Sequence, residues 1–112
     1  MPYDEETADR VRTLLEPRGV YVEKKMFGGL GFLLGGNMCC CVWKEFLILR
    51  VGQAAYANAL AQPSAREFDI TGKPMTGWVM IEPDGYDKPT DLKRWLALAT
   101  KFVATLPIKG GN

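Results

Sequence analysis

The spacing of apolar residues changes along this chain, and each change marks the boundary of a predicted element. Residues 91–106 keep apolar side chains at the i, i+3, i+4, i+7 spacing of an amphipathic helix. Residues 7–16 repeat this spacing over a shorter run, and acidic residues crowd the first turn, where the helix dipole favours them. Pro17 ends the first helix and Pro107 ends the last. The chain is therefore predicted to begin and to end with a helix.

Between the two helices, short apolar runs separated by turn residues predict a sheet. Four consecutive runs of this kind are residues 20–27, 30–34, 38–43 and 46–51. Gly35-Gly36-Asn37 is a hairpin signal, so neighbouring runs are expected to pair antiparallel. A short alanine-rich helix at 53–61 follows, and two further extended runs come after it at 66–70 and 77–82.

The strands follow one another without crossover helices, which indicates an α+β fold. We predict an antiparallel sheet of about five to six strands, with the N- and C-terminal helices packed on one face. The 112 residues form one domain, 1–112. The helix residues expected to pack on the sheet are Val11, Leu14, Leu15, Trp95, Leu96, Phe102 and Val103.

Several predicted strands are apolar on both faces, although a sheet with helices on one side usually has a polar second face. In the fourth run, Phe46 and Ile48 alternate with Leu47 and Leu49. An exposed apolar face of about several hundred Å² usually marks an interface. We therefore expect a symmetric homodimer, unless the short helix at 53–61 covers the second face.

The composition matches an ordinary globular protein. Apolar residues make up 47 %, charged residues 24 %, and the formal net charge is +1. This balance gives no electrostatic reason for strong binding to nucleic acid or to a membrane surface. No apolar stretch approaches the roughly eighteen residues that span a bilayer, and the acidic start does not resemble a signal peptide. A cytoplasmic location is expected.

The chain has no histidine, and its three cysteines are contiguous, Cys39-Cys40-Cys41. The lack of histidine excludes histidine-dependent acid–base catalysis, Ser-His and Cys-His nucleophile pairs, and histidine-containing metal sites. On a strand, alternation places Cys39 and Cys41 on one face and Met38 and Cys40 on the other. Three adjacent cysteines cannot surround a tetrahedral ion. We therefore expect no metal, no cofactor and no catalytic cysteine, and thiols that fill the core.

Two glycine-containing segments are candidate binding sites, Met26-Phe27-Gly28-Gly29 and Thr71-Gly72-Lys73-Pro74-Met75. The first segment fits neither the dinucleotide-binding fingerprint nor a phosphate loop, so a structural bend or bulge is the favoured interpretation. In the second, Lys73 in a Gly/Pro turn could contact a phosphate or a carboxylate, or simply be solvated. The basic face of the last helix, with Lys93, Arg94 and Lys101, leaves the same choice between a nucleic-acid contact and an ordinary solvated surface.

These motifs, in this order, resemble the TfoX N-terminal domain family, called Sxy-like in competence regulation. The likeness runs over nearly the whole chain, from Met26-Phe27-Gly28-Gly29 through Leu49-Arg50-Val51 and Phe68 to Trp95 and Leu106-Pro107. It implies a fold like that of type III secretion chaperones, which often form dimers. The competence regulators that give the family its name carry a second domain resembling helix-hairpin-helix modules, and the present chain is similar to their first domain.

The resemblance and the lack of a catalytic constellation favour a non-catalytic regulatory or protein-interaction domain rather than an enzyme. The alternative is a small-molecule or nucleic-acid binding module that uses the Gly72-Lys73 turn or the basic face of the last helix. The expected partners are a second copy of the chain and a further protein, with neither strong nucleic-acid binding nor a membrane. The candidate binding residues are Phe27, Gly28, Gly29, Lys73 and Met75.

Overall fold

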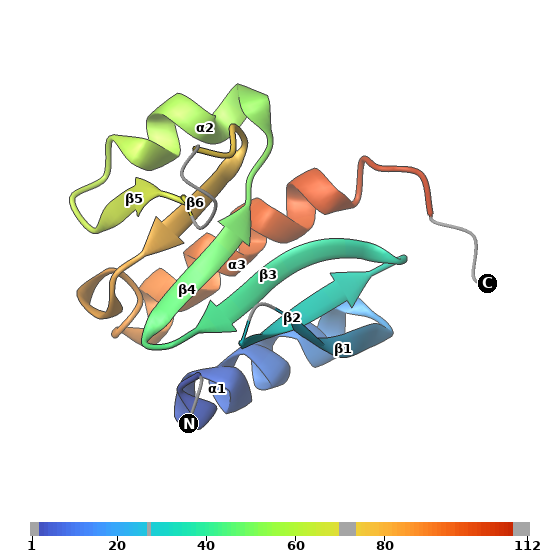
Figure 1. Ribbon diagram of the computed structural model, residues 1–112. Coiled ribbons are helices and arrows are strands. Elements are labelled where there is room, and N and C mark those ends of the chain that lie inside the picture. The colour runs from blue at the N-terminus through green and yellow to red at the C-terminus, as the bar shows by residue number, and fades with distance from the viewer. Residues whose placement is uncertain (1–2, 27, 70–73, 109–112) are drawn as a thin grey trace.

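A computed structural model describes residues 3–26, 28–69 and 74–108, which form one sheet and three α-helices (Figure 1). The helices are α1 (Glu5–Leu15), α2 (Gln53–Leu60) and α3 (Pro89–Val103). The strands are β1 (Tyr21–Met26), β2 (Gly29–Leu34), β3 (Asn37–Trp43), β4 (Phe46–Arg50), β5 (Ala65–Glu67) and β6 (Trp78–Ile81). Short 3₁₀ turns, Glu16–Arg18 and Pro83–Gly85, follow α1 and precede α3.

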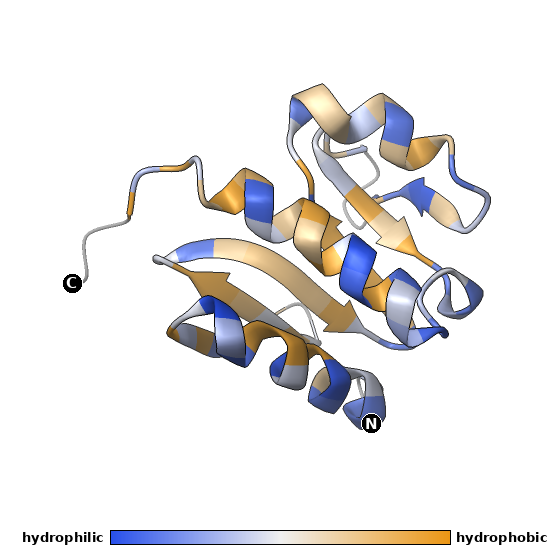
Figure 2. Ribbon diagram, turned by 180° about the vertical axis from the view of Figure 1, so that it is seen from behind, coloured by the Kyte–Doolittle hydropathy of each residue, from blue (hydrophilic) through white to orange (hydrophobic). Residues whose placement is uncertain are grey.

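The six strands form one sheet in the order β1-β2-β3-β4-β6-β5, and every neighbouring pair is antiparallel. Helices α1 and α3 cross the same face of this sheet, as the view from behind shows (Figure 2). The predicted α+β class, with an antiparallel sheet and terminal helices on one face, is confirmed. The short helix α2 lies above β5 and β6 at one end of the sheet (Figure 1).

The main core lies between the sheet and the terminal helices. Val11 and Leu15 of α1 and Leu96 of α3 are completely buried in it, and Trp95 is 1 % exposed. The buried indole N–H of Trp95 donates to the Gly85 carbonyl at 2.9 Å, so its polar group is satisfied. Two residues expected in this core, Leu14 and Phe102, are only half-buried and pack at its margin. The periodicity placed them on the correct side of their helices but could not show that they lie at its edge.

Helix α2 does not cover the second face of the sheet. Its buried residue, Ala59, belongs to the main core, and its half-buried residues pack on that same core. The separate apolar cluster on the second face contains no residue of α2. The alternative in which the short helix shields that face is therefore wrong.

A β-bulge in β3 changes the predicted facing of two residues. The register between β2 and β3 shifts between Phe32 and Leu33, so that Phe32 pairs with Cys40 and Leu33 pairs with Met38. Cys39 occupies the extra position and is buried in the main core together with Cys40, while Met38 joins Cys41 on the second face. Strict alternation predicted Cys39 on the same face as Cys41 and Met38 on the same face as Cys40. The one inserted residue exchanges the faces of Cys39 and Met38.

Local sequence explains how α1 begins. Asp4 is its N-cap, and the Asp4 carboxylate accepts a hydrogen bond from the Glu6 N–H at 3.2 Å and from the Thr7 hydroxyl at 2.7 Å. The Thr7 hydroxyl also lies 3.4 Å from the Tyr86 hydroxyl, which donates to the carbonyl of Glu45. Each hydroxyl gives its proton to another acceptor, so the contact between Thr7 and Tyr86 places the start of α1 beside the β3–β4 turn and the segment before α3 without a hydrogen bond between them.

Replacing Leu96 with Ala tests the main core. Leu96 is fully buried between α3 and the sheet, and its truncation should lower the free energy of unfolding by about 3 kcal/mol. Phe102→Ala should lower the free energy of unfolding by less per carbon atom removed, because Phe102 is half-buried. Chemical denaturation followed by circular dichroism measures both values, and a smaller loss per carbon atom removed for Leu96→Ala than for Phe102→Ala would contradict this placement of the core.

Replacing Gly52 with Ala tests a close contact. Gly52 has φ +84°, and an added Cβ would lie 2.4 Å from the Phe102 ring. Gly28 has a similar φ of +77° but open space around it. Gly28→Ala should therefore cost about 1 kcal/mol from backbone strain alone, and Gly52→Ala about 3 kcal/mol from strain plus displacement of the ring. Thermal denaturation measures the loss of stability in both variants. Equal losses would show that the Phe102 ring does not pack against Gly52.

Candidate functional site

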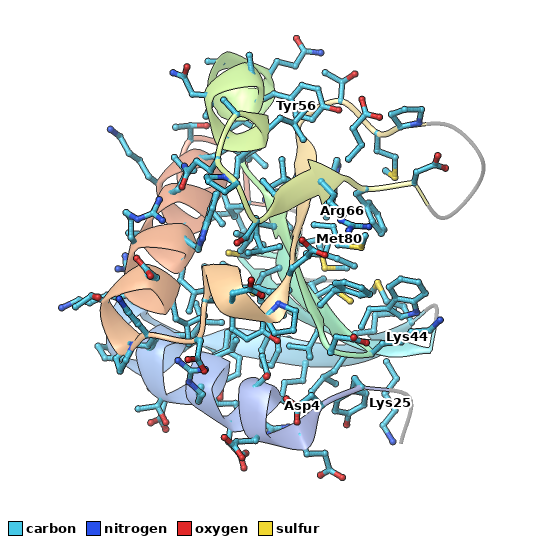
Figure 3. All side chains as sticks on the ribbon, turned by 90° about the vertical axis from the view of Figure 1, so that its left-hand side faces the viewer. Asp4, Lys25, Lys44, Tyr56, Arg66 and Met80 are labelled. Carbon is cyan, nitrogen blue, oxygen red and sulfur yellow. The ribbon has the colours of Figure 1, made fainter. Side chains whose placement is uncertain are left out.

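The face of the sheet opposite α1 and α3, called the open face from here on, is the candidate functional site. One row of paired residues crosses it through all six strands. In order, this row is Lys24, Gly31, Cys41, Ile48, Met80 and Arg66. Figure 3 shows Met80 and Arg66 on the side of the sheet away from α3. The row is apolar in the middle and has a cation at each end.

An apolar cluster occupies the open face, and none of the described helices lies above it. Ile48 is 1 % exposed, and Cys41 and Phe68 are each 6 % exposed. Their cover comes from larger half-buried side chains of the same face, which are Met38, Trp43, Trp78 and Met80. The Trp78 ring contacts the Phe68 ring with centroids 6.1 Å apart, and Trp43 stacks on Phe46 at the same distance. The face is therefore a layer of aromatic and sulfur-containing side chains open to solvent.

Methionine is concentrated here. Met26 shares the face with Gly29 by register, and Met38 and Met80 belong to the apolar cluster. Met75 lies next to Phe68, to whose carbonyl its N–H donates at 3.1 Å, and is 39 % exposed. Flexible, polarizable methionine side chains are over-used at surfaces that adapt to partners.

The glycines of β2 shape this layer. Gly31 lies on the open face, and a Cβ there would come within 2.9 Å of the Met38 methyl group. At Gly29 a Cβ would lie 2.5 Å from the Val42 carbonyl oxygen. Gly28, with φ +77°, forms the turn between β1 and β2. These positions support the structural interpretation of the glycine segment, because the lack of side chains lets Met38 lie flat over β2.

Cations line the margin of the open face. The Lys44 ammonium lies 4.6 Å from the Trp43 ring centroid. The Arg50 guanidinium lies 5.5 Å from the Trp78 centroid and 5.7 Å from that of Phe102. These distances fit cation–π contacts, which hold both cations beside the apolar layer.

Acidic groups are scarce on this face. No Asp or Glu of the described strands lies on it, because Glu23 and Glu67 occupy positions on the helix-covered side. Glu82, directly after β6, forms an ion pair with Arg66 at 2.8 Å. Lys24, Lys44 and Arg50 form no ion pair within the described ranges. The open face therefore carries excess positive charge, although the whole chain is nearly neutral.

A hollow of about 490 Å³ lies at the Arg50 corner of the open face. Its walls include Arg50, Trp78 and Phe102. Gly52 and Gly77 both have positive φ and bring the two chain segments together, since the N–H groups of Val51 and Gly52 donate to the Gly77 carbonyl. The hollow therefore offers a fixed guanidinium beside two aromatic rings.

The residues predicted as a site do not come together. Gly28 and Gly29 lie at the β1–β2 turn, whereas Met75 lies beside Phe68 near β6, with β3 and β4 between them. Phe27 and Lys73 lie outside the described residues. The structure instead brings together Met38, Trp43, Trp78 and Met80, which were not named as site residues. The sequence pattern that pointed to these residues was the apolar character of both strand faces. It indicated an exposed apolar surface but not which residues form it.

The cysteines are buried thiols. Burial raises the pKa of Cys41 to about 11, and the pKa of Cys40 is raised through its hydrogen bond with Cys39 and its own burial. All three are free. In the part of the chain that the structure describes, no three cysteine or carboxylate side chains gather in a way that could hold a metal ion.

The basic residues of α3 do not form a single face. Arg94 lies over the Trp95 ring and 3.8 Å from Asp91, so it is partly neutralised. Lys101 lines a separate groove of about 460 Å³ at the end of α3, together with Arg18. Lys93 is exposed. Among the described residues, no helix is long and apolar enough to cross a bilayer.

Comparison with known proteins gives one match. The TfoX N-terminal domain family matches residues 13–103, which covers the end of α1, the whole sheet and all of α3. No curated protein and no solved structure matches the chain, so the likeness to type III secretion chaperones stays a prediction. Because the matched residues make up most of the chain, this protein belongs to the TfoX N-terminal domain family.

Proposed function

We propose that this protein is a non-catalytic regulatory domain that acts by docking an acidic, amphipathic segment of another protein on its open face. Membership of the TfoX N-terminal domain family supports a regulatory role of the competence type. The observation that carries the proposal is the apolar cluster around Ile48, which no helix covers among the described elements. A contiguous apolar surface of this kind usually marks an interaction site.

The side chains of the open face favour a protein segment as the occupant. Met38 and Met80 can repack around aliphatic or aromatic side chains, as methionines do at grooves that receive amphipathic helices. Trp43 and Trp78 supply large, rigid contact areas of the kind that dominate protein interfaces. Single-stranded nucleic acid could also stack on these rings, and it is therefore the competing ligand in the titrations below.

The charges of the open face indicate that the segment is acidic. Lys44 and Arg50 are held beside aromatic rings without a carboxylate partner in the described chain. Complementary charges at the rim accelerate association and fix the orientation of the partner. A second copy of the chain is less suitable on this face, because a two-fold axis would bring like charges together.

The environment of the potential nucleophiles supports a non-catalytic role. A reactive cysteine is exposed and has a lowered pKa, whereas Cys40 and Cys41 are buried with raised pKa values. The chain contains no histidine to activate a hydroxyl or a thiol. Three free thiols fit the reducing cytoplasm, where we place the protein.

A synthetic peptide tests the docking proposal. An 18-residue amphipathic helix, with Leu and Trp on one face and Glu on the other, should bind saturably and change Trp fluorescence. Lys44→Glu should weaken this binding about threefold to tenfold at low salt, because a rim cation becomes an anion. Met80→Gln, which keeps the side-chain length, should weaken it by a similar factor. Titrations at low and high salt measure these effects.

Three controls decide the outcome. Lys93→Glu makes the same charge change on exposed α3 and should leave peptide binding unaltered. A peptide with Lys in place of Glu should not bind. Tighter binding of single-stranded oligothymidine than of the acidic peptide, lost in Lys44→Glu, would assign the face to nucleic acid instead. Equal weakening by Lys44→Glu and Lys93→Glu would also contradict the proposal.

Alkylation kinetics test the non-catalytic assignment. At pH 8 a thiol with a pKa of about 11 is almost entirely protonated, whereas unfolded cysteine, with a pKa of about 8.5, is partly ionised. Native protein should therefore react with iodoacetamide at least about 100-fold more slowly than protein in urea, and faster as the pH approaches 11. A cysteine labelled as fast in native as in unfolded protein would contradict the assignment.

A further inference from the structure

Strand β1 is an edge of the sheet, and its four central residues are exposed. It pairs with β2 through all six of its residues without a register shift, and nothing pairs on its other side in the described chain. The four residues from Val22 to Lys25 are all exposed. Val22 is 60 % exposed and Val20, just before the strand, is 91 % exposed. These are unusually open apolar side chains for a strand.

The outer backbone groups of β1 have no partner in the part of the chain that the structure describes. Among the described residues, no hydrogen bond joins the backbone of β1 to any element except β2. An unpaired, regular edge of this kind is a template for pairing with another strand. The opposite edge, β5, has only three residues and contacts α2, so it offers a much shorter template.

The charges along β1 select a second copy of the same strand. We propose that two copies of this protein pair their β1 strands antiparallel, with the two-fold axis at Lys24. In this register Glu23 lies opposite the partner's Lys25, and Val22 lies opposite the partner's Met26. Each of these contacts occurs twice, and opposite charges and apolar pairs across strands are both stabilising.

Neighbouring registers are less favourable. Moving the axis to Glu23 places that carboxylate opposite the partner's Glu23 and sets Val22 opposite the partner's Lys24. Moving it to Lys25 opposes Lys25 with the partner's Lys25. Registers shifted by one residue put helix-side residues opposite open-face residues, which a continuous sheet does not allow. The Lys24 register has one like-charge contact, between the two copies of Lys24 itself.

The ion pairs already present on the helix-covered side leave negative charge available for the partner. Arg12 contacts both Glu23 and Asp9, so one guanidinium is shared by two carboxylates. Lys25, on the same side of β1, forms no ion pair within the described chain. In the proposed dimer, the charges of Glu23 and the partner's Lys25 therefore neutralise each other.

The pairing would join the two sheets into one continuous sheet with all terminal helices on the same side. Both open faces would then also lie on one side, next to each other, and both would stay accessible. The inference does not depend on what the open face binds. It places the homodimer at the β1 edge, whereas the apolar strand pattern predicted one on the second face of the sheet.

Charge exchange tests the proposal through sedimentation velocity between about 5 and 200 μM. The wild type should show a concentration-dependent monomer–dimer equilibrium. Lys25→Glu should weaken the dimer at least about tenfold, because two opposite-charge contacts become like-charge contacts. The double variant Glu23→Lys with Lys25→Glu should restore dimerization. Thermal denaturation confirms that each variant remains folded.

Lys93→Glu is the matched control, because it makes the same change on exposed α3, and it should leave the dimer intact. A wild type that is monomeric at 200 μM would overturn the proposal. A dimer unaffected by Lys25→Glu, or weakened equally by Lys93→Glu, would overturn it as well. Failure of the acidic peptide to bind would not change any of these readings.

Engineered cysteines test the register. Lys24→Cys places two thiols across the two-fold axis, so diamide should convert most of this variant to a covalent dimer. Val22→Cys places the thiols about four residues apart along the paired strands, and it should cross-link far less. The wild-type protein, whose three cysteines are buried, is the negative control. Equal cross-linking of the two variants would show that the strands do not pair in this register.

Discussion

Both faces of this sheet are apolar, but the described helices cover only one of them, and the rest of the structure follows from this asymmetry. Helices α1 and α3 together cover one face, where Leu15, Trp95 and Leu96 are buried. Helix α2 does not shield the other face, because Ala59 anchors it to the same core. Burial of apolar area is the main stabilising term in folding, so an uncovered apolar face has to be stabilised in another way.

The open face is stabilised by packing within its own layer. Gly31 leaves room for Met38 to lie flat across β2, and Ile48 and Cys41 are buried beneath larger neighbours. Lys44 and Arg50 lie over aromatic rings at the margin, where their charged ends still reach water. The result is a surface that is stable in the isolated chain and still apolar enough to bind. Aromatic rings and methionines beside cations are the combination that suits an acidic, amphipathic partner.

The architecture could be predicted from the sequence, because helices, strands and turns are specified by local sequence patterns. Turn glycines, helix-ending prolines and the two periodicities place every described helix and strand to within a few residues. The facing of β3 was not predictable, because a bulge at Cys39 leaves no mark in an alternating apolar run. The half-burial of Phe102 depends on where α3 ends relative to β4, which is a tertiary property.

The candidate site was harder to predict than the fold, for a physical reason. Gly28 and Gly29 stand out in the sequence because turns and close contacts require glycine, and that requirement is structural rather than functional. The residues that form the open face, such as Trp43, Trp78 and Met80, come from strands far apart in the sequence, β3 and β6. Nothing in their local sequence distinguishes them from core residues, and only the positions of the helices determine which face stays open.

The most direct test of this account measures which methyl groups contact solvent. A neutral, water-soluble nitroxide added to methyl-labelled protein broadens the NMR signals of exposed methyl groups. The account predicts strong broadening for the methyl groups of Met38 and Met80, on the open face, and almost none for those of Val11 and Leu96, under the helices. Methionine signals as protected as that of Leu96 would contradict it, because the second face of the sheet would then be covered in the native protein.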